Sequence, residues 1–245
     1  MANGFLFYRG PSAIDNEPII AIATFGSKNA KTGSGLIQTW IMREDIGPVD
    51  AQKNGSDRSV CGSCPLRPII MHSAKAWRIA EPRARQCYVK TFQAPRSVWS
   101  AYHRGVYPAL EAFRNLHKLA GMRIRLGSYG NPSAIPFEAW ADLARVTGAR
   151  IGTGYDHMWR IGDSRFSRIL MASVHSEDEA REAQSLGYRT FRVRKSTDPI
   201  MENEIICPAS KEAGKRLTCD KCFACNGNPG GKDTLRARSI VIMEH

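Results

Sequence analysis

Four cysteines near the carboxyl end constrain this chain more than any other feature. Residues 205–226 read IICPASKEAGKRLTCDKCFACN, so Cys207 lies in a Cys-Pro step, and Cys219, Cys222 and Cys225 follow at two-residue gaps. Such gaps let thiolates converge on one ion from a tight turn, and a fourth thiolate can come from a distance. We therefore predict a metal site: four thiolates suit tetrahedral zinc, and the C-x2-C-x2-C run also suits a 4Fe–4S cluster.

A second cysteine group lies earlier in the chain. Cys61 and Cys64 form another C-x2-C in the segment CGSCP, and Cys87 follows after a stretch rich in arginine and lysine. His72 lies between them and can complete a Cys3His zinc site; the alternative is a free cysteine pair with Cys87 in the core. The two groups can also converge and share ligands, so the sequence leaves open whether the protein has one zinc or 4Fe–4S centre or two.

The charge of the chain indicates its partner. Lys and Arg number 35 against 23 Asp and Glu, which gives a net charge of +12 and an isoelectric point near 9.6. Such an excess favours a polyanion, usually nucleic acid, and we expect DNA before RNA. A basic enzyme that binds no polyanion is the alternative.

Cysteine usage and hydropathy indicate the compartment. No segment approaches the ~20 apolar residues of a membrane helix, and residues 1–18 lack the basic start and apolar core of a secretory signal. Seven cysteines, an odd number, favour thiolates in a reducing cytoplasm over disulfides. We expect no membrane partner, and the oligomeric state stays open.

Cationic and aromatic side chains are interleaved around Cys87. Arg85 and Lys90 are the cations that we expect to contact phosphate, and Trp77 and Tyr88 lie among them. Cations between aromatic rings suit phosphate contact combined with base stacking. This segment is therefore the predicted nucleic-acid contact of the chain.

The hydrophobic pattern predicts an α/β fold. Apolar runs at 5–8, 18–25 and 36–42 indicate a β-meander, and residues 97–120 carry apolar side chains at helical spacing, with Pro108 opening a second helix that ends at Gly121. From residue 122 the chain alternates between strands and helices, which builds a parallel sheet with crossover helices. The expected strands are 122–128, 150–155, 168–174, 188–194, 204–209 and 239–244, and the expected helices are 137–148 and 176–187.

About eight strand segments of this kind predict a complete or distorted β/α (TIM-like) barrel with cysteine metal-binding inserts. An open doubly wound sheet is the alternative. The predicted parts are an N-terminal meander (1–60), a basic cysteine-containing insert with helices (61–121) and the barrel segment with the cysteine cluster (122–245). No strand is followed by G-x-G-x-x-G, which argues against a dinucleotide domain. The loop GSKNAKTGSG also lacks the spacing of a nucleotide-binding P-loop, so we expect a basic hairpin tip there.

The carboxyl ends of barrel strands carry the active site, and this rule selects candidate residues. Asp156 and His157 follow one strand and form the best acid–base pair, with Tyr155 beside them. A loop-capping aspartate with a hydrogen-bonded histidine is the alternative. Cys207 also ends a strand, so we expect its cysteine group beside the barrel mouth. The other strand ends offer Ser128, Tyr129, Asn131, Trp159, Ser173, His175, Glu244 and His245.

Two arginines alternate on the strand TFRVR. Arg192 and Arg194 are two residues apart, so both side chains point to the same face of that strand. A paired guanidinium face suits phosphate binding, and a solvated strand edge is the alternative.

Several phrases together resemble a family of uncharacterised cysteine-rich phage and mobile-element proteins. They are YRGPSAIDNEPIIAIAT, CGSCP, VWSAYHRGVYP, GSYGNPSAIP, TGYDHMWR and CPASKEAGKRLTCDKCFAC, and they span nearly the whole chain. This resemblance implies a phage or mobile-element setting, and hence the cytoplasm of a host bacterium.

A second likeness concerns the last third only. RILMASVHSEDEAREAQSLGYRTFRV followed by the cysteine cluster is similar to the late barrel strands and zinc site of tRNA-guanine transglycosylases and of phage DNA deazapurine transglycosylases. It implies base exchange through an aspartate nucleophile, and Arg192 stands where that aspartate is expected. Cluster-bearing radical S-adenosylmethionine barrels are a third comparison, although their C-x3-C-x2-C run is missing here.

The first functional hypothesis is therefore a metal-dependent transferase of the β/α-barrel type that modifies a nucleic-acid base. The second is a non-catalytic DNA- or RNA-binding phage protein with structural zinc or iron–sulfur sites.

Overall fold

A single sheet of nine strands organises the protein in the computed structural model, which describes residues 2–27, 31–67, 70–73, 76–79, 87–214, 217–230 and 238–244. The strands of this sheet are β1 (Gly4–Pro11), β2 (Pro18–Thr24), β3 (Leu36–Arg43), β6 (Arg123–Tyr129), β7 (Arg150–Asp156), β8 (Met171–Val174), β9 (Thr190–Arg194), β10 (Glu204–Ile206) and β11 (Ser239–Met243). The α/β class predicted from the sequence is confirmed.

The sheet is open rather than closed. Its order is β1-β2-β3-β6-β7-β8-β9-β11-β10, with β1, β2 and β3 antiparallel and every later pair parallel. Up to β9 the order follows the chain, as in a barrel, and it lacks the reversal of a doubly wound sheet. The predicted complete barrel is wrong, because β1 and the three-residue β10 remain as edges and do not pair with each other in the described part of the chain.

Short helices connect the strands. They are α1 (Pro48–Asn54), α2 (Arg58–Cys61), α3 (Ala94–His103), α4 (Phe137–Thr147), α5 (Glu177–Ser185) and α6 (Cys219–Cys222), with 3-10 turns η2 (Leu110–Ala112), η3 (Leu116–Leu119), η4 (Pro132–Ala134) and η5 (Ser164–Arg168). A separate antiparallel hairpin is formed by β4 (Ile70–Ser73) and β5 (Ala76–Ile79).

Local sequence signals explain the two crossover helices. The Ser176 hydroxyl accepts a hydrogen bond from the Glu179 amide at 3.1 Å, and acidic residues fill the first turn of α5, both of which stabilise a helix start. α4 ends where Gly148 adopts φ 65°, a left-handed conformation that glycine takes at little cost.

The segment 97–120 is less helical than its pattern predicts. α3 ends at His103, and the rest contains only the 3-10 turns η2 and η3. Tertiary pairing explains the difference, because the Leu6 amide donates to the Pro108 carbonyl at 2.9 Å and Ala109 bridges to Leu6. This contact holds the chain extended where the second helix was expected to start.

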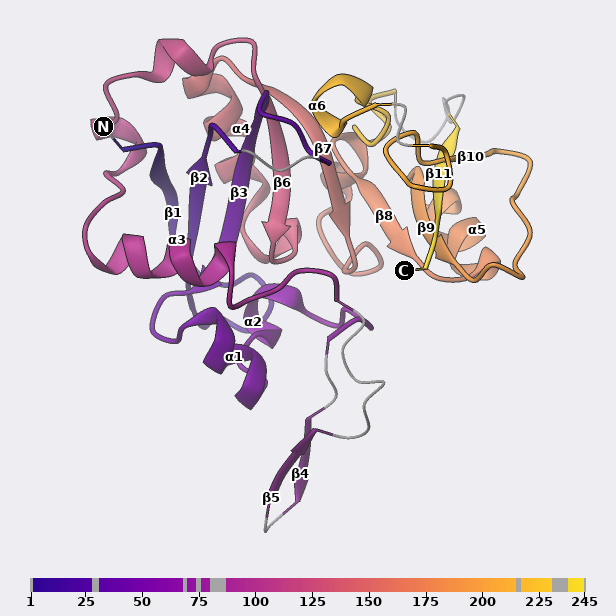
Figure 1. The fold of residues 1–245 in the computed structure, drawn as a ribbon, viewed down its shortest axis with the longest axis horizontal. Helices are drawn as coiled ribbons and strands as arrows, with labels where there is room; N and C mark the ends of the chain where they lie inside the picture. The colour runs from indigo at the N-terminus through magenta and orange to yellow at the C-terminus, as the bar shows by residue number, and fades with distance from the viewer. Residues whose placement is uncertain are drawn as a thin grey trace.

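Two apolar clusters lie on the sheet. The larger one includes Trp140 and Leu143 of α4 and Ala180 and Ala183 of α5, and both helices lie behind the sheet in Figure 1. The smaller one joins Met171 and the β11 residues to cysteines of the 207–225 segment. A register shift between β6 and β7 at Ile124 changes which side chains of β7 face each cluster.

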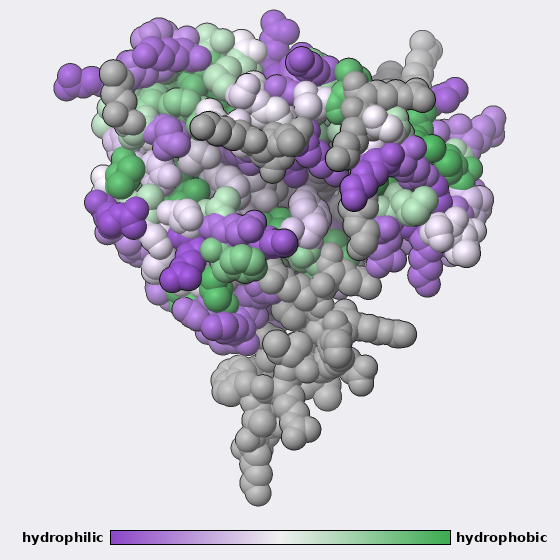
Figure 2. Space-filling view, in the orientation of Figure 1, coloured by the Kyte–Doolittle hydropathy of each residue, from purple (hydrophilic) through white to green (hydrophobic). Residues whose placement is uncertain are grey.

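The face of the protein in Figure 2 is largely polar. Figure 2 shows hydrophilic residues spread over one face, with hydrophobic residues in small separate patches between them. Among the helices of the described segments, none is both long and apolar enough to cross a bilayer.

Candidate functional site

The cysteine group that follows β3 lies in a tightly hydrogen-bonded loop. Cys61 ends α2, the Cys64 amide donates to the Cys61 carbonyl at 3.2 Å, and the Cys87 amide donates to the Leu66 carbonyl at 3.2 Å. The backbone amides of Leu66 and Arg67 donate to the Cys64 sulfur. Amide donors of this kind stabilise a thiolate, which is the form that binds metal.

The three thiols of this group interact with one another. Burial, with a smaller effect from the nearby Cys87, raises the pKa of Cys64 to about 11. Burial also raises the pKa of Cys61, with added effects from Asp57, Cys64 and Cys87. The fold therefore brings Cys87 close to Cys61 and Cys64, although Cys87 follows Cys64 by 23 residues in the sequence. His72, the predicted fourth ligand, has a side chain that lies outside the described residues.

A buried ion pair holds this loop in shape. The guanidinium of Arg67 pairs with Asp57 and also donates to the carbonyl oxygens of Gly62 at 3.0 Å and Gly55 at 3.1 Å. Both charged side chains are largely buried. Arg67 thus ties the segment after the C-x2-C turn to Gly62 within the turn and to Gly55 and Asp57 before α2, so it serves the loop and not an external phosphate.

Asn131 connects this loop to the carboxyl ends of β6 and β7. Its backbone amide donates to the Val60 carbonyl at 2.6 Å, and its side-chain oxygen accepts a hydrogen bond from the His157 backbone amide at 2.9 Å. The side-chain Nδ2 donates to Asp156, which also accepts from Ser133 at 2.9 Å. One asparagine thus joins the first cysteine loop to the two residues that were predicted to handle protons.

Met158 makes a second connection between these elements. Its sulfur lies 3.3 Å from both the amide nitrogen and the hydroxyl of Ser63. A Cβ on Gly62 would fall 2.3 Å from that sulfur, so only glycine fits at this point of the turn. The C-x2-C turn is therefore packed directly against the loop that follows β7.

The predicted catalytic residues do not form one network. Asp156 is fully buried, and burial raises its pKa; one of its oxygens accepts three hydrogen bonds and the other has no partner in the described residues. Tyr155 instead packs against Phe191 and hydrogen-bonds to the Cys225 thiol. Successive strand residues point to opposite faces, so the predicted convergence of Tyr155 with Asp156 is wrong.

His157 has a different neighbour from the one predicted. Its ring stacks on His175 with 5.9 Å between centroids and 10° between planes. Burial, with a smaller effect from the facing His175, lowers the pKa of His157 to about 4. The pKa of each imidazole is lowered by burial, so both rings are uncharged at neutral pH, and the His157 ring faces His175.

The second cysteine group lies at the other end of the strands. The Cys219 amide donates to the Lys31 carbonyl at 3.0 Å, and the Asp220 amide donates to the Thr32 carbonyl at 3.1 Å. The Asp220 carboxylate accepts the Gly35 amide at 3.1 Å. The glycine-rich loop joins the antiparallel strands β2 and β3, as the predicted hairpin tip does, and its described part is also a docking site for α6.

Arginines at the starts of strands complete this docking. Arg123, the first residue of β6, lies 3.3 Å from the centroid of the Phe223 ring. Arg189, just before β9, donates to the Ala224 carbonyl at 2.9 Å and the Gly227 carbonyl at 2.9 Å. The segment that carries Cys219, Cys222 and Cys225, which together with Cys207 we name the four-cysteine arm, therefore covers the amino-terminal ends of β6 and β9.

The four thiols of this arm share one environment. Burial, with smaller effects from the thiols of Cys207, Cys219 and Cys222, raises the pKa of Cys225 to about 12, while the hydrogen bond from the Tyr155 hydroxyl opposes the shift. Cys207, Cys219 and Cys225 belong to the smaller apolar cluster. The amide of Ala209 donates to the Cys207 sulfur, as the amides of Leu66 and Arg67 do to Cys64.

A buried arginine that the sequence analysis missed faces these thiols. Arg125 is 8% exposed and makes no ion pair with a carboxylate in the described part of the chain. Burial lowers its pKa, but Tyr88, Tyr155, Cys219 and Cys225 outweigh that effect. The alternation Arg-Ile-Arg in β6 was the available signal, since it places both arginines opposite the core-facing Ile124.

The two cysteine groups occupy opposite ends of β6. Tyr129, its last residue, interacts electrostatically with Cys61 and Cys87, whereas Arg123, its first residue, contacts Phe223 beside Cys222. Figure 1 shows α2 and α6 at opposite ends of the sheet. The structure therefore places Cys207 and its group away from the position beside His157 that the sequence predicted, and it places the Cys61 group there.

Neither predicted arginine of β9 presents a phosphate-binding face. Arg192 is 1% exposed and pairs with the fully buried Glu204 through contacts of 2.6 and 2.7 Å. Arg194 is also buried and pairs with Glu212. Both guanidinium groups are neutralised internally, which corrects the phosphate prediction. Lys90 is exposed, and Arg85 lies outside the described residues.

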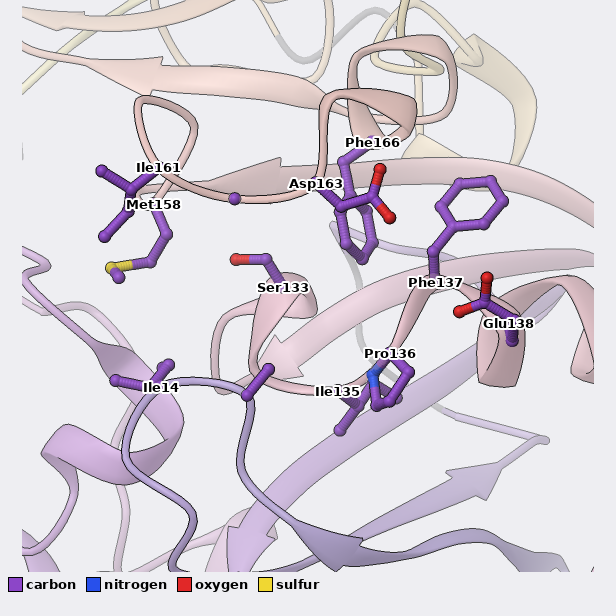
Figure 3. Close-up of a pocket in the computed structure, with 12 residues that line it drawn as sticks. Ile14, Ser133, Ile135, Pro136, Phe137, Glu138, Met158, Ile161, Asp163 and Phe166 are labelled. Carbon is purple, nitrogen blue, oxygen red and sulfur yellow. The ribbon is translucent and has the colours of Figure 1, made fainter.

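A cavity of about 360 Å³ opens beside the loop that follows β7 (Figure 3). Ser133 and Met158 line it together with the rings of Phe137 and Phe166. Its acidic residues, Glu138 and Asp163, are both paired with Arg165 at 2.7 and 2.5 Å. The cavity is therefore mostly apolar, with no unpaired cation that suits a phosphate among its described lining residues.

The donor chemistry of both groups fits a thiophilic metal. The sulfurs are close enough to shift one another's pKa, and amides and cations surround them. Within the described residues, however, no three Cys, His, Asp or Glu side chains are already gathered at ligating distances. Binding therefore requires the thiol side chains to move together and to lose their protons.

Comparisons with known proteins leave the family open. The chain matches no family model, no curated protein and no solved structure. The fold and the two thiol groups thus define only a class, an α/β protein with an open, largely parallel sheet and cysteines at both ends of its strands.

Proposed function

We propose that the protein is a metal-dependent enzyme that acts on nucleic acid, with two thiolate centres of different roles. The observation that carries this proposal is the three-cysteine group at the carboxyl ends of the parallel strands, tied through Asn131 to Asp156 and His157. Ligand sites of parallel α/β sheets lie at that edge.

The number of thiols assigns the roles. Catalytic metal sites keep a coordination position open, whereas structural sites are closed by four protein ligands. Cys61, Cys64 and Cys87 supply three thiolates, and the fourth position, for which His72 was the predicted ligand, is the one that we propose stays open for a substrate or water. The four cysteines of the four-cysteine arm can fill all four coordination positions of a structural zinc or 4Fe–4S site, which would fix this arm to β3, β6 and β9.

The surrounding residues supply proton chemistry. Burial raises the pKa of Asp156, which favours the protonated carboxyl group, an acid. Burial lowers the pKa of His157 to about 4, which favours the neutral imidazole, a base. A metal ion or cluster in the three-cysteine centre would supply Lewis-acid or electron-transfer chemistry. His157 and His175 offer neutral imidazoles on the same edge of the sheet.

Modification of a base is the reaction that we propose within this class. A base must leave its stack to reach a protein site, and the largely exposed ring of Tyr88 directly follows Cys87. An aromatic surface beside a metal centre is suited to hold such a base.

The test is chemical analysis of the nucleic acid. Protein purified without oxygen is incubated with an oligonucleotide and a free deazapurine base, which would replace a base of the strand as that base is released, and the nucleosides are then separated and weighed by mass spectrometry. We expect a nucleoside of changed mass with the wild type and none with Cys64→Ser. An unchanged nucleoside pool with fully metal-loaded protein would reject the enzyme proposal.

One observation favours the second candidate, a non-catalytic nucleic-acid-binding protein with two structural metal sites. The described cavity near Asp156 is apolar, and its acidic residues are already paired with Arg165. Salt-dependent binding without chemical change of the nucleic acid is the outcome that selects this candidate.

A further inference from the structure

Three neighbouring side chains of the segment after Cys87 are exposed to solvent. Tyr88 is 66% exposed and Phe92 55% exposed, and Lys90 between them is exposed as well. The intervening Val89 packs against the main core, and the buried Thr91 hydroxyl donates to the Gln52 side chain at 2.7 Å. The inward residues thus fix which side chains face solvent, and we name Tyr88, Lys90 and Phe92 the aromatic ladder.

The ladder is anchored beside the proposed metal centre. Arg125 donates from Nη2 to the Tyr88 hydroxyl at 3.3 Å, which positions the edge of that ring and leaves its face exposed. The preceding residue, Cys87, belongs to the three-cysteine group. A ligand held on the ladder therefore lies next to that group.

The chemistry of the ladder selects one kind of partner. Exposed aromatic rings stack with bases of any sequence, and an intervening cation contacts the phosphate backbone. Duplex bases are already stacked on one another, so their faces are accessible only in single strands or after extrusion. The net charge of +12 adds long-range attraction for a polyanion.

We propose that single-stranded nucleic acid binds along the aromatic ladder, with bases stacked on Tyr88 and Phe92 and a phosphate at Lys90. This inference rests on the proposed function and specifies its substrate as single-stranded. The ladder delivers one base toward the three-cysteine group.

Fluorescence anisotropy with a labelled single strand of about 12 nucleotides and its duplex tests the inference. Tyr88→Ala and Phe92→Ala should each weaken single-strand binding at least about fivefold, because each removes a stacking surface. Tyr88→Trp should retain the affinity. Lys90→Gln should reduce the slope of log affinity against log salt by about 0.7.

Leu186→Ala is the matched control, because Leu186 is also exposed, at 48%, but lies at the end of α5. It should leave binding unchanged. Circular dichroism and metal content are measured for every variant, so that a folding defect is separated from a lost contact.

Two results overturn the ladder and leave the proposed function standing. One is salt-dependent binding by the wild type with both alanine variants within about twofold of it; the other is an equal loss for single strand and duplex. Absence of nucleic-acid binding by the metal-loaded wild type is a different result, because it rejects the proposed function itself. Self-association that is lost in Tyr88→Ala would assign the ladder to a protein contact and overturn the inference.

Discussion

Gly33 should control the docking of the four-cysteine arm. Its φ is 76°, and a Cβ there would fall 2.1 Å from the nearer carboxylate oxygen of Asp220. Asp220 holds α6 to the β2–β3 loop through the Gly35 amide at 3.1 Å and through its own amide on Thr32. Gly33→Ala therefore strains the backbone and also displaces the carboxylate.

Gly26 is the matched control in the same loop, since its φ is 75° and a Cβ there meets nothing within 4 Å. A side chain in the left-handed region costs about 1–2 kcal/mol, so Gly26→Ala should lose about that much stability. Gly33→Ala should lose a further ~1.5–3 kcal/mol, the contribution of a hydrogen bond to a charged group.

Urea unfolding monitored by circular dichroism gives the free energies of both variants. The rate at which a thiol reagent labels metal-free protein reports whether the arm undocks alone, and labelling should be faster in Gly33→Ala than in Gly26→Ala. Equal stability losses together with equal labelling rates would refute the docking role that we assign to Asp220.

Three further predictions concern buried ionisable side chains. Arg192→Met should cost about 3–5 kcal/mol because it leaves Glu204 buried and unpaired, while nucleic-acid binding by the folded fraction stays unchanged; a loss of affinity without a loss of stability in urea unfolding would restore its phosphate role. His157 has a pKa of about 4 when folded and 6.5 when free, so the unfolded state binds more protons between these values and stability falls from pH 6.5 to pH 4, by up to about 3 kcal/mol. His157→Gln should flatten this part of the stability–pH curve measured by urea unfolding, and an unchanged slope would contradict the assigned burial. Arg125→Met should weaken metal retention by the four-cysteine centre about 10- to 100-fold in a chelator competition, and Arg125→Lys less; equal retention in all three proteins would show that the cation does not support the centre.

Local patterns predicted much of the fold. The serine cap and acidic first turn of α5 and the terminal glycine of α4 were sufficient to place these helices. The strands from β6 to β11 were also expected near their observed positions. These signals act over one or two turns of chain, so they survive in any tertiary arrangement.

The long-range arrangement was not predictable in the same way. A barrel closes only if the strand tilt and the stagger of the hydrogen-bond register bring the two edge strands together, and no local sequence pattern encodes these quantities. The register shift between β6 and β7 after Ile124 places Tyr155 on the same face as Arg125, the face of the four-cysteine arm. Tertiary pairing of Pro108 with Leu6 likewise overrode a helical pattern.

The candidate site was predicted in its residue types but not in its geometry. All seven cysteines were identified from spacing, and Cys207 does follow a strand, β10, but its group was expected beside His157, where the structure places the Cys61 group instead. Spacing specifies which thiols can share a centre, but the end of the sheet that a loop covers depends on its docking partners. The strand-end rule selected Asn131, and its role as the link between Val60 and His157 emerged only from the fold.

Elemental analysis of protein purified without oxygen tests most directly whether two separate thiolate centres exist. The wild type should hold about two zinc ions, or the iron of about two 4Fe–4S clusters with the matching brown colour. Cys64→Ser and Cys222→Ser should each remove one centre and leave the other loaded. Folded wild-type protein without metal, or loss of all metal on either single substitution, would contradict this account.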